Sequence, residues 1–461
     1  MLRILAKLLT LAAVLATQQE PPTLNMDSEK PHSRHVRQNL HPHTHLPTPG
    51  LIQARGYPAE VHHVITDDGY ILEMHRIPYS PRRPRPHVNP IQQNIHTKNN
   101  VIRSLLLQQR ARNTSIEVLR KSVENLSRKM SIDASKKVVF IQHCVMCSSA
   151  DFVMNEPDQA LAFMLSDAGY DVWLGNARGN FYSRRHVILS PSQTKFWDFS
   201  WDKMGRYDMP AMLRYVKKAT GVEQLNYIGH SMGTSIFFAM MNYHPHINSW
   251  IRVMTALAPV AYMHNKHAPF RFFTPFAEGI DRAFTRRGLP ELGRATAESS
   301  SFASAFCSPL SIFQPLCKLF FAFVGGPNNS KYVDKEYLPV IAAHTPAGSS
   351  IHVLTHFLQL VRDRQFQAYD YGVTRNLREY GSPRPNAFKL SAITCPVGAF
   401  FADNDWVADF ADVRQTLSEL PKVVYMHRVQ VKDFNHLDFL WGENAGHLVY
   451  RYVVDFLNLY N

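Results

Sequence analysis

The sequence has no long hydrophobic run beyond its first sixteen residues and no internal repeat. No later segment reaches about 18 consecutive uncharged apolar residues, the length that a helix needs to cross a bilayer, so we expect no transmembrane helix. Low-complexity stretches are also absent. The 461 residues are 45% hydrophobic, which is enough to bury a large core, either as one α/β domain with an elaboration or as two domains.

Cysteine is scarce. The chain has five cysteines, and an odd number leaves at least one thiol over in an oxidising compartment. Cys307 and Cys317 would close a short loop and are the pair that we expect to bond. Cys144 and Cys147 have the spacing of a redox pair, but nothing around them resembles a thioredoxin unit, so the spacing alone does not indicate redox catalysis.

Acidic residues are rare in one segment only. Residues 82–137 contain 13 Lys or Arg and three Asp or Glu, a surplus of ten within a formal net charge of +13. The rest of the chain is therefore close to neutral, which argues against nucleic acid as a partner. Helical spacing of apolar residues and a possible capping box at Thr114 and Glu117 predict an amphipathic helix in this insert. It is either a solvated surface helix or an arm for acidic membranes or lipid droplets.

The N-terminus has the features of a secretory signal over residues 1–16. Arg3 and Lys7 precede the apolar stretch LLTLAAVLA, and small residues allow cleavage before Thr17. An uncleaved anchor is the alternative, although the stretch is short for a span. Secretion agrees with glycosylation sequons at Asn113, Asn125 and Asn328.

Residues 17–50 are rich in Pro, His and polar residues and are expected to form a mobile leader. The histidines of HPHTHLPTPG lack an ordered scaffold and cysteine partners, so we expect no metal site there. Residues 51–81 predict two strands with a hairpin turn at Asp68-Gly69.

The remainder predicts an α/β fold with a mostly parallel sheet. Strand-like and helix-like segments alternate over residues 138–260, starting with KVVFIQH and including QLNYIGH and RVMTALAPV. Aromatic, helical segments broken by Pro and Gly occupy residues 261–372 and indicate an inserted cap. The α/β pattern resumes over residues 373–461. Most cap aromatics are expected to form the cap's own core, and some could line an acyl pocket.

One serine stands between two glycines in YIGHSMGTS, residues 227–235. A serine hydroxyl needs exposure and a neighbouring base to act as a nucleophile. A sharp turn from a strand into a helix gives that exposure, but it crowds the backbone two residues before and after the serine. Gly229 and Gly233 therefore predict a strained elbow that presents Ser231.

In such folds the acid and the histidine follow the serine in the chain. The segment VKDFNHLDFLW offers His436 as the base, in a polar turn after the last strand. Spacing alone does not choose the acid. The candidates are Asp403, Asp405, Asp409, Asp433 and Asp438.

Several long segments occur in a fixed order: GHSMGTS, AGYDVWLGNARGN, FWDFSWDKMGRYDMPA, HTPAGSS, RQFQAYDYG and DFNHLDFLW. With them the chain resembles the acid lipase family, which includes gastric and lysosomal lipases, from about residue 51 to the C-terminus except for the insert. The resemblance implies an α/β-hydrolase fold with a helical cap. It implies hydrolysis of triglycerides, cholesteryl esters or related acyl esters at a lipid–water interface, without a cofactor, by a secreted or lysosomal enzyme.

Carried over by motif, Ser231 is the nucleophile, His436 the base and Asp405 the acid. The cap disulfide joins Cys307 to Cys317, and Asn328 falls near a family glycosylation site. The backbone N–H groups of Met232 and Val145 are the expected oxyanion donors.

The chain departs from the family's pattern in three places. Cys144 stands where the family usually has Gly, and it would strain the loop if that position needs a positive φ. Met232 replaces a common Gln, and the basic insert is extra. Because of the family resemblance, a lipase is nevertheless the leading hypothesis. A lipid-binding protein that has lost catalysis and a small-ester carboxylesterase are the alternatives.

Overall fold

The computed structural model describes residues 41–83, 137–264, 269–293, 296–327 and 336–460. The predicted signal segment, most of the leader, nearly all of the basic insert and the three sequons lie outside the described residues. In the described part of the chain, no helix combines the length and the apolar character that a membrane span requires.

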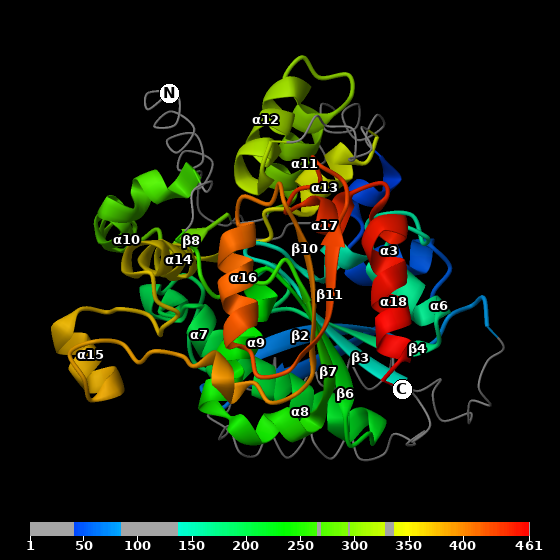
Figure 1. The fold of residues 1–461 in the computed structure, drawn as a ribbon. Helices are drawn as coiled ribbons and strands as arrows, with labels where there is room; N and C mark the ends of the chain where they lie inside the picture. Colours follow the sequence, from blue (N-terminus) through cyan, green and yellow to red (C-terminus); the bar gives the residue numbers. More distant parts are fainter. Residues whose placement is uncertain (1–40, 84–136, 265–268, 294–295, 328–335, 461) are drawn as a thin grey trace.

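A mostly parallel sheet runs through the centre of the molecule (Figure 1). Its order is β1-β2-β4-β3-β6-β7-β10-β11, with β5 paired to β2. From β4 to β11 all neighbours are parallel, and β1, β2 and β5 add antiparallel pairs at the other end. The strands are β1 (Glu60–Ile65), β2 (Tyr70–Ile77), β3 (Lys137–Gln142), β4 (Tyr170–Gly175), β5 (Arg185–His186), β6 (Leu225–His230), β7 (Ile251–Leu257), β10 (Val397–Ala402) and β11 (Val423–Val429).

The inner strands arise from continuous apolar runs. Every residue of β4, β6 and β10 is buried, as expected for parallel strands that are covered on both faces. The edge strand β11 instead alternates between half-buried and exposed positions over most of its length. The α/β fold class predicted from strand–helix alternation is therefore confirmed by the sheet.

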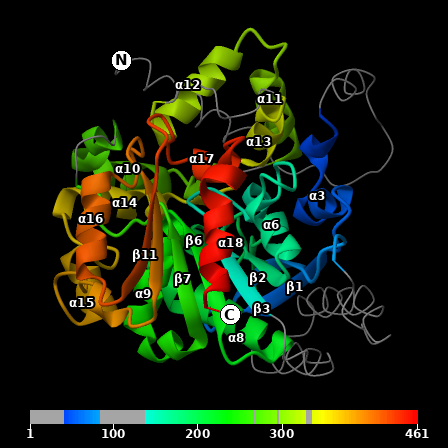
Figure 2. The same ribbon diagram turned by 45° about the vertical axis from the view of Figure 1, so that its right-hand side comes forward.

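Helices cover both faces of the sheet (Figure 2). One face carries α6 (Leu161–Asp167) and α18 (Arg451–Asn458), and the other carries α8 (Met209–Thr220), α9 (Met232–Tyr243) and α16 (Phe410–Glu419). The helix α9 starts three residues earlier than its apolar run, directly after Ser231. Short helices α7 (Trp201–Lys203) and α17 (Asp438–Trp441) complete the core.

The folded body begins earlier than the predicted leader boundary at residue 50. A 3-10 helix (Pro42–His45) is followed by α3 (Thr48–Ala54). Thr48 is fully buried, and its hydroxyl lies 3.0 Å from that of Ser149. The Pro- and His-rich composition suggested mobility, but these side-chain contacts hold the end of the segment against the core.

A cap of helices is inserted between β7 and β10, in the region predicted from its aromatic composition (Figure 1). The disulfide Cys307–Cys317 joins two of its helices, and it is the pair expected from the sequence. The elements of the predicted cap, residues 261–372, are a 3-10 helix (Pro269–Phe276), α10 (Ala277–Arg286), β8 (Glu291–Leu292), α11 (Ala297–Cys307), α12 (Gln314–Gly325), α13 (Leu338–His344), β9 (Ser349–Ser350) and α14 (Ile351–Asp363). Beyond its predicted boundary, α15 (Val373–Tyr380) precedes β10.

Candidate active site

Ser231 occupies a strained turn between β6 and α9. Its backbone has φ 54° and ψ −118°, a region that residues with a side chain rarely adopt and that costs roughly 1–3 kcal/mol. The Ser231 N–H donates to the carbonyl of Leu257, 3.0 Å away on the neighbouring strand β7. The surrounding structure therefore holds the residue in a conformation that it would not choose by itself.

The two glycines around Ser231 lie where no side chain would fit. A Cβ on Gly229 would stand 2.8 Å from the backbone of Gly233, and a Cβ on Gly233 would overlap the carbonyl oxygen of Gln142. Neither glycine has a positive φ, so both are needed for space. This is the crowding that the sequence pattern predicts, and it also places the start of α9 directly against the end of β3.

Ser231, His436 and Asp405 form one hydrogen-bonded chain. The Ser231 Oγ lies 2.7 Å from His436 Nε2, and His436 Nδ1 lies 2.7 Å from Asp405 Oδ2. Because the carboxylate is an acceptor, Nδ1 carries the ring proton in the neutral histidine. Nε2 is then free to accept the Ser231 proton.

Asp405 is the acid that contacts the His436 ring among the described residues. Its second oxygen, Oδ1, accepts the N–H groups of Val407 and Ala408 at 2.8 and 2.7 Å. These bonds fix the carboxylate where the chain leaves β10. Asp405 is also buried, so solvent does not compete for its oxygens.

Three of the other candidate acids have different partners. Asp403 forms an exposed ion pair with Arg428, Asp409 caps the start of α16, and Asp438 accepts the N–H of Asn435. The structure thus brings Asp405 to the histidine, which spacing alone could not predict.

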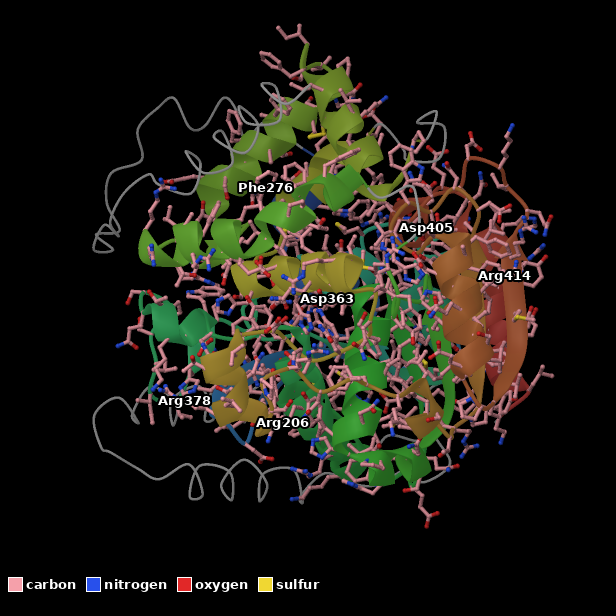
Figure 3. The ribbon with its side chains drawn as sticks, turned by 60° about the vertical axis from the view of Figure 1, so that its left-hand side comes forward. Arg206, Phe276, Asp363, Arg378, Asp405 and Arg414 are labelled. Atoms are coloured by element: carbon pink, nitrogen blue, oxygen red, sulfur yellow. A yellow bond between two sulfur atoms is a disulfide. The ribbon has the colours of Figure 1, made fainter. Side chains whose placement is uncertain are left out.

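The three side chains meet because their strands are parallel. Ser231 follows β6, Asp405 follows β10 and His436 follows β11, and the carboxyl ends of parallel strands lie at one edge of a sheet. In Figure 3, Asp405 lies on the side of the core that faces the cap, where Phe276 is labelled.

The end of the cap helix α12 closes over this edge. The N–H of His436 donates to the carbonyl of Gly325 at 3.2 Å, and the side-chain amide of Asn435 donates to Gly326 at 2.9 Å. Ser231 and His436 are only 3% and 4% exposed. These cap contacts are not among the predictions from sequence, although VGGP at residues 324–327 is a helix-ending signal that marks their position.

The loop after β3 contains a second disulfide, Cys144–Cys147. The N–H of Cys147 donates to the carbonyl of Cys144 at 3.3 Å, so the bridge spans a four-residue turn. We expected strain at Cys144 if its position needed a positive φ. The left-handed residue of this loop is instead Met146, at φ 55°.

The buried side chain of His143 hydrogen-bonds to this loop and to the segment after β4. Its Nδ1 donates to the carbonyl of Cys144 at 2.7 Å, and its Nε2 accepts the N–H of Ala177 at 3.0 Å. Both bonds need the neutral ring with its proton on Nδ1. Burial favours that form because it lowers the pKa of His143 to about 4.

The two predicted oxyanion donors lie on neighbouring turns. Val145 is half-buried in the disulfide-closed turn, and Met232 is buried at the first position of α9. In the described part of the chain, neither backbone N–H donates to an acceptor. Whether these two N–H groups bind a substrate oxygen is part of the proposed function.

A buried carboxyl group, Asp151, connects three segments around the site. It accepts hydrogen bonds from the Ser148 N–H at 2.7 Å, the Thr345 hydroxyl at 2.9 Å and the Trp441 indole at 3.2 Å. Burial raises the pKa of Asp151 to about 6. No local sequence pattern predicts this role for Asp151, because Thr345 and Trp441 are distant from it in the chain.

Comparison with known proteins gives a consistent result. A family model described as the alpha/beta hydrolase fold matches residues 138–443, and one described as a partial alpha/beta-hydrolase lipase region matches residues 48–156. The chain is 34% identical to lipase lipl-1 of Caenorhabditis elegans, over 90% of this chain and 92% of that one. It is 34% identical to lipase 3 of Drosophila melanogaster, over 89% and 92%. It is 33% identical to gastric triacylglycerol lipase of Bos taurus, over 88% and 90%.

Proposed function

The chain belongs to the lipases of the α/β-hydrolase fold, and from this premise we propose that it hydrolyses carboxylic acyl esters through Ser231, His436 and Asp405. The observation that carries the proposal is the hydrogen-bonded chain of these three side chains at one edge of the sheet. Triglycerides are the first substrate class, since relatives of similar length are named triacylglycerol lipases. Cholesteryl esters are the second.

The reaction proceeds in two halves. His436 Nε2 takes the proton of Ser231 as Oγ attacks the ester carbonyl, and Asp405 stabilises the resulting imidazolium. The imidazolium then gives its proton to the leaving alcohol, which departs and leaves an acyl-enzyme on Ser231. Water, activated by the same histidine, releases the fatty acid and restores the serine.

The tetrahedral oxyanion needs donors that are already in place. We assign this role to the backbone N–H groups of Met232 and Val145, each worth roughly 3 kcal/mol by analogy with measured oxyanion donors. Both lie beside the nucleophile turn, because Gly233 packs against the end of β3.

The cap offers a surface for the lipid–water interface. The two most exposed apolar side chains among its described residues lie in the loop between α11 and α12, where Leu310 is 88% exposed and Ile312 86%, and Leu319 on α12 is 64% exposed. Exposed apolar clusters of this kind mark interaction sites. Since the cap covers Ser231, entry of a lipid requires the cap to move, and contact with lipid would favour the open state.

We place the protein in an oxidising compartment, either outside the cell or in the lysosome. Two disulfides agree with this, as do the signal-like segment and the sequons of the sequence.

Two comparisons separate this function from its alternatives. A serine-directed phosphonate should label Ser231 in the wild-type protein and not in Ser231→Ala, whereas a lipid-binding protein without catalysis would not be labelled. Long-chain triglyceride should be hydrolysed in preference to short soluble esters. The opposite preference would indicate a carboxylesterase.

A further inference from the structure

We propose that the Cys144–Cys147 disulfide positions an oxyanion donor: it holds the loop that presents the backbone N–H of Val145, in place of the glycine that the family's pattern has at residue 144. The inference rests on the proposed esterase function and deepens it. The disulfide has a positioning role, and the reaction itself never breaks it.

The disulfide closes a turn that is unfavourable without support. Val145 and Met146 are its two central residues, and the Cys147 N–H bonds to the Cys144 carbonyl across it. The positive φ of Met146 is the geometry that a type II turn requires at this position, where glycine or asparagine is usual. The covalent link between Cys144 and Cys147 keeps the ends of the turn together despite that cost.

Other contacts hold the turn on both sides of Val145. The carbonyl of Cys144 accepts the Nδ1 proton of His143 at 2.7 Å. The carbonyl of Met146 accepts the N–H of Ala347 at 2.6 Å, from the cap segment that precedes α14. Val145 lies between these anchors with its own N–H unused among the described residues. The turn is thus fixed by its carbonyls and its disulfide, and the free donor is the N–H at its centre.

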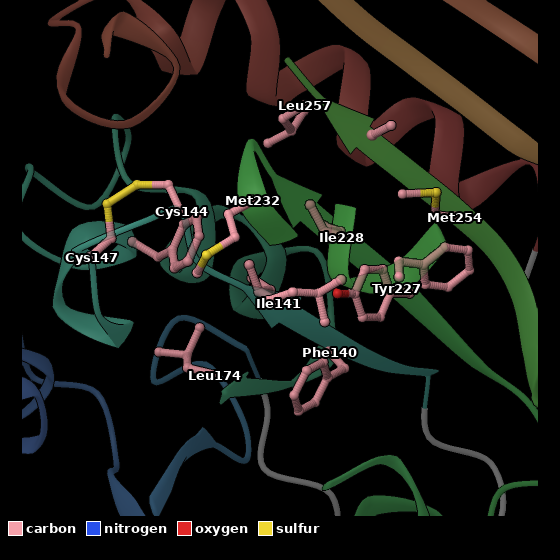
Figure 4. Close-up of a cluster of buried hydrophobic side chains, with 14 of the residues drawn as sticks. Phe140, Ile141, Cys144, Cys147, Leu174, Tyr227, Ile228, Met232, Met254 and Leu257 are labelled. Carbon is pink, nitrogen blue, oxygen red and sulfur yellow. A yellow bond between two sulfur atoms is a disulfide. The ribbon is translucent and has the colours of Figure 1, made fainter. Parts of the chain in front are cut away.

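The turn is also next to the nucleophile. It continues directly from β3, and the carbonyl oxygens of Gln142 and His143 lie against Gly233, two residues after Ser231. Figure 4 shows the disulfide beyond the end of β3, with Met232 labelled in the same region. Cys144 and Cys147 are at most 3% exposed, which fits a permanent structural bond better than a bond opened in each catalytic cycle.

The first measurement is the thiol content of the unfolded wild-type protein. Two disulfides among five cysteines leave one titratable thiol, that of Cys395. Three thiols, with Cys144 and Cys147 among the cysteines that a thiol reagent labels, would mean that the Cys144–Cys147 bond does not form, and the proposal would be overturned.

The second measurement is kinetic and uses a short, water-soluble ester, so that lipid binding does not enter. Cys144→Ala/Cys147→Ala should lower kcat roughly 10- to 100-fold, part of the loss found when an oxyanion donor is removed, with little change in KM. Cys307→Ala/Cys317→Ala is the matched control, because it removes a disulfide from the cap, and it should keep kcat near the wild-type value.

A thermodynamic cycle separates positioning from general stability. Val145→Pro removes the N–H at a turn position that tolerates proline. If the disulfide acts through this donor, removing the disulfide from the Val145→Pro variant should lower kcat little further. If Cys144→Ala/Cys147→Ala lowers kcat by the same factor in the wild-type protein and in Val145→Pro, the disulfide acts elsewhere. If Cys144→Ala/Cys147→Ala leaves the wild-type kcat unchanged, the proposal is also overturned.

If the Cys144→Ala/Cys147→Ala variant does not fold, the bond can be cut in the folded Cys307→Ala/Cys317→Ala variant, where a reductant meets Cys144–Cys147 as the remaining disulfide of the described residues. A small dithiol supplies two electrons and two protons, becomes a cyclic disulfide and leaves two thiols at Cys144 and Cys147. Activity should fall and should return on reoxidation, whereas activity that persists after reduction contradicts the proposal. A wild-type protein without serine-dependent esterase activity would instead refute the proposed function.

Discussion

Single residues decide the geometry of the nucleophile. Ser231 adopts its left-handed conformation because Gly229 and Gly233 leave room for the turn. This requirement could be predicted from the sequence, since it depends only on neighbours in the chain. The choice of Asp405 over four other acids could not, because it depends on where a loop places one carboxylate.

Gly233→Ala should therefore impair both activity and stability. Its Cβ would overlap the Gln142 carbonyl oxygen, so either the start of α9 or the end of β3 has to shift. We expect a loss of kcat of at least tenfold and a lower Tm, measured on a soluble ester and by thermal unfolding. Gly279→Ala is the control, since a Cβ there meets nothing within 4 Å and alanine is the better helix former by about 1 kcal/mol. Equal behaviour of the two variants would contradict the crowding argument.

Asp405→Asn tests the tautomer of His436. An amide can donate to Nδ1, and this stabilises the ring with its proton on Nε2, where it cannot accept from Ser231. The expected loss in kcat is about 10⁴-fold at neutral pH, as for the equivalent change in a serine protease. Asp403→Asn, which breaks only an exposed pair with Arg428, should retain activity. Comparable losses in the two variants would argue against Asp405 as the acid.

Asp151 should give stability a distinct pH dependence. Its pKa in the folded protein is about 6, above the ordinary value of 3.8, because burial disfavours the carboxylate. The folded state therefore holds the proton more tightly than the unfolded state. Its stabilising contribution is complete below about pH 4 and is lost as the pH rises through 6, on the order of 3 kcal/mol in total.

The comparison with Asp151→Asn isolates this contribution. The difference in free energy of unfolding, wild type minus variant, should decrease between pH 4 and pH 6 in denaturant titrations. Parallel pH profiles of the two proteins would mean that Asp151 keeps an ordinary pKa.

At the level of elements, the cap is the part least predictable from sequence. Its aromatic residues indicated an inserted domain, but they did not indicate that the end of α12 binds the loop of His436 through Gly325 and Gly326. Such contacts join residues about 100 positions apart, and no local pattern encodes them. The strands and helices of the core follow local periodicity and were easier to place.

The exposed loop between α11 and α12 should affect activity on emulsified lipid and not activity on soluble esters. Leu310→Ser/Ile312→Ser removes two apolar side chains that are more than 85% exposed, so folding should not change. We expect severalfold lower activity on emulsified triglyceride and unchanged kcat on a soluble ester, because only the former needs adsorption to an interface. Ile188→Ser is the control, because Ile188 lies outside the cap and its side chain is 80% exposed. Equal effects of both variants on the emulsion would contradict a specific lipid-binding role for the loop.

At the scale of the whole molecule, one sheet edge gathers the groups to which we assign the proposed reaction. Parallel strands bring the serine, the acid and the base together, the loop after β3 adds a donor, and the cap closes the site from above. Fold class and chain order were predictable because they depend on alternation of strands and helices. The closure of the cap and the second disulfide were not, since they depend on packing between distant segments.

Release of fatty acid from emulsified long-chain triglyceride tests the central claim most directly. The purified wild-type protein and Ser231→Ala would be compared at pH 5 and pH 7.5. The account predicts release by the wild type at one or both pH values and none above background by the variant. The more active pH would indicate the lysosome or the extracellular space. Equal release by both proteins, or none by either, would contradict the assignment of Ser231 as the nucleophile of a lipase.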